Sequence, residues 1–151
     1  MNLALKATLY KSCTSYLQKR LDVIEHRLNE LNDSLQAETK SSVGDKYETG
    51  RAMLHLEKDK QMQQLAVLLG YKKQLHAIDP SAQYTTVEQG ALVQTNQGTF
   101  YLSISAGKLK IDGEIYFAIT LASPIGQLLF QRKVGDEFVF RGRSYVLEDI
   151  T

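Results

Sequence analysis

Two carboxylates three residues apart, Asp45 and Glu48, are the residues of this sequence whose type and spacing best suit chemistry. They stand in a short polar stretch, 41–51, which carries two glycines and separates two long segments with a helical pattern. Carboxylate oxygens are the ligands that Mg²⁺ takes from proteins, and it usually takes only one or two of them. The alternative is structural, because Asp45 could cap the second helix while Glu48 completes a capping box. Taken alone, the spacing favours the cap, since such caps are common at helix starts.

The composition is that of an ordinary globular chain. Its 151 residues suit one medium domain or two small ones, and the net charge of +1 indicates neither a nucleic acid nor a membrane surface as a partner. The single cysteine, Cys13, excludes an internal disulfide and a cysteine metal cluster, and we expect it to be a small apolar filler on a helix. No apolar run is long enough for a signal peptide or a membrane span, so we expect a cytoplasmic protein with no membrane partner.

The elements on either side of the acidic stretch predict a helical hairpin. Segment 3–37 has no glycine or proline, and its apolar residues are spaced 4, 3, 4, 3 and 4 apart, which is typical of a coiled-coil seam. These residues are Leu17, Leu21, Ile24, Leu28, Leu31 and Leu35. Segment 52–78 repeats the helical pattern less regularly, with Met53, Leu54, Met62, Leu65, Leu68, Leu69 and Leu75. Because the connection is short, we predict an antiparallel coiled-coil hairpin over 1–79 with its tip at 41–51, about 50 Å long by helical rise.

The second half predicts a small sheet. Asp79-Pro80-Ser81 ends the second helix and indicates a domain boundary, and the apolar period changes to two from Tyr84 onward. Turn signals around Gln97, at Asp112-Gly113 and around Gly142 predict three hairpins. Ser123-Pro124 predicts the capped start of one short helix. We therefore predict an α+β chain in which 80–151 is an antiparallel sheet domain with one helix. The expected core stripe is Phe117, Ile125, Leu128, Phe138 and Phe140.

The order of these parts resembles the bacterial Gre-type transcript cleavage factors, over essentially the whole chain. The most specific segment is Ser123-Pro124-Ile125-Gly126-Gln127-Leu128-Leu129 followed by Lys133-Val134-Gly135-Asp136. It is similar to that family's Ser-Pro-hydrophobic helix and its Lys-x-Gly-Asp turn. The second segment, Gly44-Asp45-Lys46-Tyr47-Glu48, is similar to the family's Gly-Asp-x-x-Glu at the hairpin end.

The resemblance implies a function as well as a fold. It implies that the sheet domain is FKBP-like and docks on the rim of the secondary channel of RNA polymerase, with Ser123, Pro124 and Ile125 beginning the docking helix. The coiled coil would then carry Asp45 and Glu48 to the polymerase active site, where they help to hold the second Mg²⁺ beside the nascent backtracked RNA. Two-metal hydrolysis of a phosphodiester needs such an ion. The factor, a monomer, would have no cofactor of its own and would not be an enzyme by itself.

Departures from the family pattern keep other functions open. Thr49-Gly50-Arg51 follows Glu48 where the family pattern continues Asn-Ala-Glu-Tyr, and Ala122 stands where many relatives have an acidic or hydroxyl residue. The alternative function is a secondary-channel regulator or inhibitor of polymerase without cleavage activity. A peptidyl-prolyl isomerase is suggested only by the FKBP-like sheet, and a fold alone does not establish function. An adaptor whose coiled coil pairs with another protein is the remaining alternative.

Further polar residues have two interpretations each. The cations of the tip could lie near RNA phosphate, or they could be solvated side chains that keep the hairpin soluble. They are Lys40, Lys46 and Arg51. Cations of the sheet domain could form a solvated face or a docking surface, and these are Lys108, Lys110, Arg132, Lys133, Arg141 and Arg143. The three histidines, His26, His55 and His76, are expected to be structural or surface residues, because their spacing does not suit a joint metal site.

Overall fold

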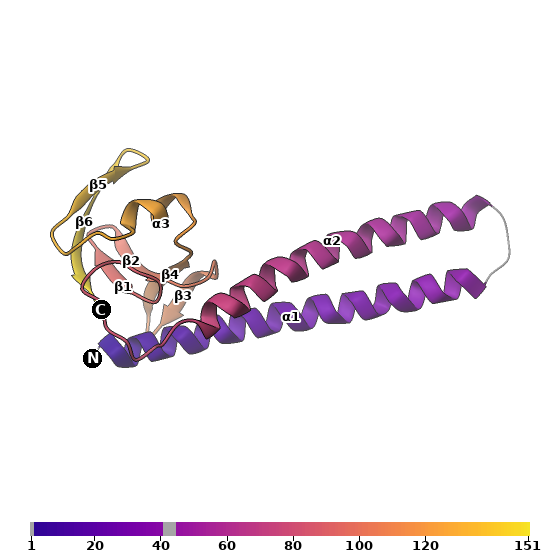
Figure 1. Ribbon diagram of the computed structural model, residues 1–151, viewed down its shortest axis with the longest axis horizontal. Helices are drawn as coiled ribbons and strands as arrows, with labels where there is room; N and C mark the ends of the chain where they lie inside the picture. The colour runs from indigo at the N-terminus through magenta and orange to yellow at the C-terminus, as the bar shows by residue number, and fades with distance from the viewer. Residues whose placement is uncertain (1, 41–44) are drawn as a thin grey trace. The chain divides into compact units, whose positions relative to one another are not determined.

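The computed structural model describes residues 2–40 and 45–151, and it confirms the predicted α+β class. Two long helices come first, α1 (Asn2–Lys40) and α2 (Asp45–His76), and they run side by side as a hairpin (Figure 1). The sheet and one short helix follow. By proximity of Cα atoms the chain divides into two compact units, one formed by Met1–Tyr16 with Tyr71–Thr151 and the other by Leu17–Gly70. This division falls within the two helices rather than at Pro80.

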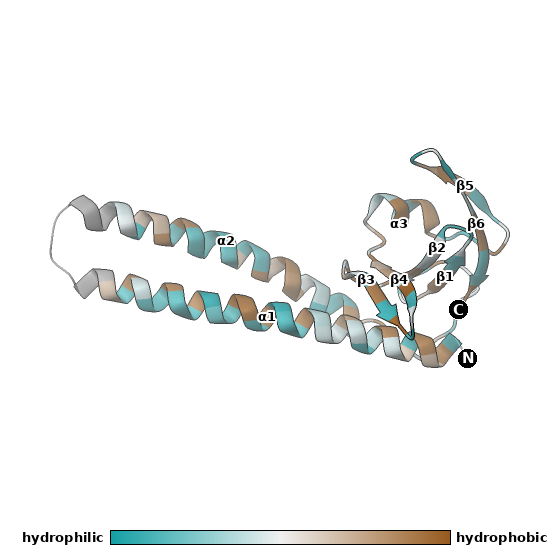
Figure 2. Cartoon of the chain, turned by 180° about the vertical axis from the view of Figure 1, so that it is seen from behind, coloured by the Kyte–Doolittle hydropathy of each residue, from teal (hydrophilic) through white to brown (hydrophobic). Residues whose placement is uncertain are grey.

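The unit Leu17–Gly70 is built on the predicted heptad seam. Four of the six predicted α1 positions are buried, and they are Leu17, Ile24, Leu31 and Leu35. The seam on α2 is less regular, because Met53 and Met62 keep 66% and 48% of their surface exposed, whereas Leu68 is buried. Apolar residues recur along both helices between hydrophilic ones (Figure 2). A two-helix hairpin buries only one stripe of each helix, so the remaining apolar residues of α2 face solvent.

The start of α2 differs from the sequence-based prediction. The helix begins at Asp45 rather than near Ala52, so Thr49, Gly50 and Arg51 lie within it and not in a loop. A glycine inside a helix costs only about 1 kcal/mol relative to alanine, which a long helix packed along a seam tolerates. Of the predicted tip, residues 41–44 lie outside the described part of the chain.

The sheet has six strands in the order β3-β4-β2-β1-β6-β5. Their bounds are β1 Leu92–Thr95, β2 Gly98–Leu102, β3 Gly107–Ile111, β4 Glu114–Ile119, β5 Glu137–Phe140 and β6 Arg143–Ile150. The predicted antiparallel sheet is confirmed for four of the five neighbouring strand pairs, and β2 and β4 form the one parallel pair. After β2 the chain forms β3 at the edge of the sheet. The tight turn after β3 reverses the chain, so β4 lies between β3 and β2 and runs parallel to β2.

Two of the hairpins use the turn chemistry that their sequences indicate. Asp112 and Gly113 have φ of 51° and 83°, and Arg141 and Gly142 have φ of 50° and 78°. Two consecutive positive φ values are the mark of the type I′ turn, whose twist suits a two-residue hairpin. The Asp-Gly signal therefore correctly places the β3–β4 hairpin, and Gly142 the β5–β6 hairpin.

The core of the sheet lies under the short helix α3 (Pro124–Leu129). Its buried members are Val87, Ala91, Val93, Phe100, Leu102, Leu129, Phe138, Tyr145 and Leu147. The predicted core stripe is confirmed, because Phe138 is buried and its other four members are partly buried against this cluster. Side chains alternate along a strand, so Tyr101, between Phe100 and Leu102, points to the opposite face of the sheet. No helix in the described ranges has the length and apolar character needed to cross a membrane.

Candidate functional site

The first turn of α2 contains both predicted acidic residues. The helix begins at Asp45, and Glu48 lies three residues further along it. Residues three apart are neighbours on a helix surface, and negative groups are favoured at a helix N-terminus by the exposed backbone N–H groups. The structure describes the backbone of Asp45 and Glu48 but not their side chains. The preceding residue, Gly44, lies outside the described part of the chain. The backbone therefore places the two acids together, and whether they act as a cap or as metal ligands stays a prediction.

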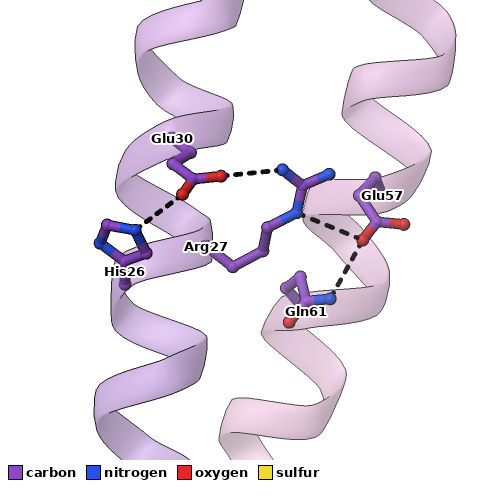
Figure 3. A network of polar contacts seen from close by, with 5 residues as sticks. All are labelled: His26, Arg27, Glu30, Glu57 and Gln61. Carbon is purple, nitrogen blue, oxygen red and sulfur yellow. Dashed lines mark hydrogen bonds and ion pairs between the residues drawn. The ribbon is translucent and has the colours of Figure 1, made fainter.

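A polar network joins the two helices further along the hairpin. Arg27 of α1 points toward α2 and places its Nε 3.7 Å from Oε1 of Glu57 (Figure 3). Glu57 also accepts a hydrogen bond from Gln61 at 3.1 Å, and Arg27 contacts Glu30 at 3.2 Å. These side chains are partly exposed, so the network contributes modestly to holding the helices together.

His26 belongs to the edge of this network. Its Nε2 lies 2.7 Å from Oε1 of Glu30, and 77% of its side chain is exposed. The prediction of a surface histidine is therefore confirmed for His26. Among the side chains that the structure describes, those of residues 2–37 and 49–151, no group of three or more histidine, cysteine or acidic residues is placed to hold a metal ion.

The Ser-Pro segment forms the start of α3, as predicted. Ser123 is the N-cap, its Oγ accepts a hydrogen bond from the Gly126 N–H at 3.0 Å, and it donates to the Thr120 carbonyl at 2.7 Å. Pro124 occupies the first helical position and is exposed. Ile125 is half-buried against the core under α3. Two of the three predicted docking residues thus have intramolecular contacts, and Pro124 offers its surface to solvent.

Gly126 is a residue whose importance the sequence did not reveal. A Cβ built at this position would lie 2.1 Å from the Thr120 carbonyl oxygen and 2.8 Å from Ser123 Oγ. No real side chain tolerates such distances, so the loop before α3 can close only on a glycine. A glycine inside a six-residue helix is the sequence signal for this constraint.

The Lys-x-Gly-Asp segment is a tight turn fixed to β6. The Asp136 carboxylate accepts a hydrogen bond from the Lys133 N–H at 2.8 Å, and Gly135 has a φ of 91°. The backbones of Gly135 and Asp136 exchange hydrogen bonds with Leu147 at 2.8 and 3.0 Å. The segment therefore connects α3 to β5 in one fixed conformation.

One of the sheet-domain cations has a structural function. The Arg132 guanidinium donates to the carbonyls of Leu128 and Glu137 and lies 5.0 Å from the centre of the Phe138 ring. It ties the end of α3 to the start of β5. The other cations of that set are exposed, and they are Lys108, Lys110, Lys133, Arg141 and Arg143.

Buried polar groups in the unit that contains the sheet were also missed by sequence reasoning. Cys13 is buried, as expected of a filler, but its Sγ lies 3.5 Å from Ser103 Oγ, and burial raises the pKa of the thiol. The Tyr101 hydroxyl is buried with no hydrogen-bond partner among the described residues, and burial raises its pKa as well. Lys6 is fully buried. A helical pattern shows which face is inward but not which polar groups that face will carry.

The fold thus defines an α+β protein with a two-helix hairpin and a six-stranded sheet. Comparison with protein families finds no matching family model, and no curated protein matches the chain. Among solved structures the chain is similar to the transcription factor Gfh1, with 21% sequence identity over 93% of this chain and 92% of that chain. The TM-score of this similarity is 0.35.

Proposed function

We propose that this protein is a transcription elongation factor that binds RNA polymerase through its secondary channel and stimulates cleavage of backtracked RNA by the polymerase. The observation that carries this proposal is the place of Asp45 and Glu48 in the first turn of α2, at the end of the hairpin where α1 and α2 are joined. Two helices could carry an acidic pair into a channel that is too narrow for a compact domain to enter.

The donor set suits Mg²⁺. Asp45 and Glu48 offer carboxylate oxygens, which are hard ligands, and Mg²⁺ is typically bound by one or two carboxylates while it keeps several waters. Such an ion, when bound in the polymerase, would stabilise charge at the scissile phosphate. The chain itself would contribute the two carboxylates and the helix that delivers them. The factor would therefore assist the polymerase rather than catalyse alone.

The sheet would contribute the binding surface. Pro124 is exposed at the start of α3, and Ser123 and Gly126 hold that start in one conformation. A preformed surface loses little conformational entropy on binding, which favours its use for docking. We therefore assign polymerase docking to the region of Ser123, Pro124 and Ile125.

The proposal is tested by cleavage of a backtracked transcript by the cognate polymerase with added protein. The double variant Asp45→Asn, Glu48→Gln is expected to bind polymerase as the unchanged protein does and to lose stimulated cleavage. Asp33→Asn is the matched control, because Asp33 is an exposed acid on α1. Undiminished cleavage with the double variant would contradict a function of the two acids.

The alternative is a polymerase regulator that occupies the same channel without cleavage. The residues that favour it are Thr49, Gly50 and Arg51, which depart from the family pattern and continue the helix directly after Glu48. The same assay separates the two functions. Short RNA products and restart of stalled complexes support cleavage, whereas slowed synthesis without products supports inhibition.

A further inference from the structure

Lys6 places a charged ammonium group in the interior of the protein. The residue has 0% of its surface exposed, although it lies on the second turn of α1. Its Nζ donates hydrogen bonds to the Ala82 carbonyl at 2.6 Å and to the Thr151 backbone oxygen at 3.1 Å. It also lies 4.8 Å from the centre of the Tyr84 ring. The cation is therefore surrounded by carbonyl dipoles and an aromatic face.

A buried lysine is costly to a fold unless its environment compensates the charge. Burial lowers the pKa of Lys6, and the negative charge of Asp79 opposes this effect. In the described ranges, no carboxylate side chain lies within 4.0 Å of Nζ as an ion-pair partner. Taking a charge out of water costs free energy, and carbonyl acceptors offset this cost less fully than an ion-pair partner would. A contribution to overall stability is thus a poor explanation for a lysine at this position.

The contacts of Lys6 explain it better as a connection between distant segments. Ala82 and Tyr84 belong to the segment that leads from α2 to β1, and Thr151 directly follows β6. The Thr151 oxygen accepts a second hydrogen bond, from the Leu92 N–H at 3.1 Å. One ammonium therefore joins the first turns of α1 to the connecting segment and to the end of β6.

Neighbouring contacts of α1 are polar as well. Asn2 Nδ2 donates to Asp149 and to Thr151 Oγ1, both at 2.9 Å, and the Tyr10 hydroxyl donates to the Leu75 carbonyl at 2.9 Å. Hydrogen bonds are directional, whereas apolar packing is not, so polar contacts select one placement of a helix among several. Lys6 is the most buried of these three donors.

We propose that Lys6 is a positioning residue, whose buried ammonium fixes the first turns of α1 on the end of β6 and on the segment between α2 and β1. Loss of the charge releases these turns of α1 without unfolding the sheet. This inference does not depend on the proposed function. Lys6 thus determines where the first turns of α1 lie, through its polar contacts, rather than how stable the fold is.

Hydrogen exchange of backbone amides tests this assignment in Lys6→Met. We expect exchange of the α1 amides of residues 9–13 and of the Thr151 amide to become faster by about tenfold or more, because a hydrogen bond to a charged group is lost. Amides of Phe100, Leu102 and Leu147, in the core under α3, should keep their protection. Lys11→Met is the control, because Lys11 is an exposed lysine on the same helix. It should change none of these rates.

A chemical rescue separates the charge from the shape of the side chain. Lys6→Cys in a Cys13→Ala background, aminoethylated in urea and refolded, restores an ammonium at position 6. We expect it to restore the slow exchange of residues 9–13, while the unmodified Lys6→Cys does not. Unchanged exchange in Lys6→Met, or equal acceleration across α1 and the sheet core, would overturn the assignment. Neither exchange experiment needs polymerase, so their failure can be distinguished from failure of the cleavage assay.

Discussion

Ser123 and Gly126 form a closed unit in which the side chain of one residue requires the absence of a side chain on the other. Ser123 Oγ accepts the Gly126 N–H at 3.0 Å, and a Cβ on Gly126 would lie 2.8 Å from the same oxygen and 2.1 Å from the Thr120 carbonyl. The hydrogen bond draws the backbone of position 126 against the preceding loop. The Ser-Pro-Ile-Gly order therefore encodes one specific conformation at the start of α3.

Gly126→Ala should destabilise the protein markedly. The added methyl group meets backbone rather than a movable side chain, so we expect a loss of about 1–3 kcal/mol, as for overpacked core positions. Urea unfolding followed by circular dichroism measures it. Gly70→Ala is the matched control, because nothing lies within 4 Å of a Cβ built at that exposed helical position. It should stabilise α2 by about 0.5–1 kcal/mol, and equal effects of the two substitutions would contradict the steric interpretation.

Ser123→Ala should cost about 1 kcal/mol of unfolding free energy, because it removes the N-cap of α3 and leaves the Gly126 N–H without its acceptor. Ser123→Asn keeps a capping oxygen and should recover most of this loss. The two variants are compared by urea unfolding at one pH. If Asn proved as damaging as Ala, the hydrogen bond that Ser123 donates to Thr120, rather than the cap, would be the important contact.

Cys13 should make the fold sensitive to alkali. Burial raises the pKa of its thiol in the folded chain above the ordinary value of 9.0. As pH rises through 9.0, the thiol ionises in the unfolded chain but stays protonated in the folded chain. The unfolded state then binds fewer protons, so stability falls with rising pH until the folded pKa is reached.

The comparison of Cys13→Ala with the unchanged protein isolates this effect from the other buried groups. At pH 7 the variant should be the less stable of the two, because it loses packing and the contact with Ser103. Above pH 9 the difference should shrink by up to about 1.4 kcal/mol per pH unit. Urea unfolding at pH 7, 9 and 10 measures it. A difference that is constant with pH would show that the thiol has the same pKa in both states.

Much of this fold follows from local sequence rules. The heptad spacing from Leu17 to Leu35 predicts the buried stripe of α1, and Asp112-Gly113 predicts the β3–β4 turn, because each rule depends only on near neighbours. The parallel pairing of β2 with β4 does not follow from such rules. It depends on where the chain goes after Leu102, which is a property of the whole sheet.

The candidate site divides in the same way. Ser123 as a helix cap could be predicted, since a cap is a contact across three residues. The buried position of Lys6 could not, because its acceptors lie 76 and 145 residues away in the chain. Asp45 and Glu48 were predicted from their spacing, their place between two helical segments and the family motif, and the structure adds that both stand in the first turn of a helix.

The contact between Arg27 and Glu57 should hold α1 and α2 together only weakly. Their charged atoms are 3.7 Å apart, and the two side chains are 44% and 34% exposed, so water screens the attraction. A double-mutant cycle with Arg27→Ala and Glu57→Ala should give a coupling energy below about 1 kcal/mol. The cycle for Arg27 and Glu30, which lie on the same helix, is the comparison and should give about 0.3–0.5 kcal/mol.

Salt distinguishes this pair from a desolvated one. The screening length falls to about 3 Å at 1 M salt, so both coupling energies should drop when urea unfolding is repeated there. Glu57 also accepts a hydrogen bond from Gln61, and Gln61→Ala should leave the Arg27–Glu57 coupling nearly unchanged, because that bond lies along α2. A coupling that exceeded about 2 kcal/mol and resisted salt would instead mark a buried charge pair. The hairpin would then depend on that pair, in addition to the leucine seam, for the alignment of its two helices.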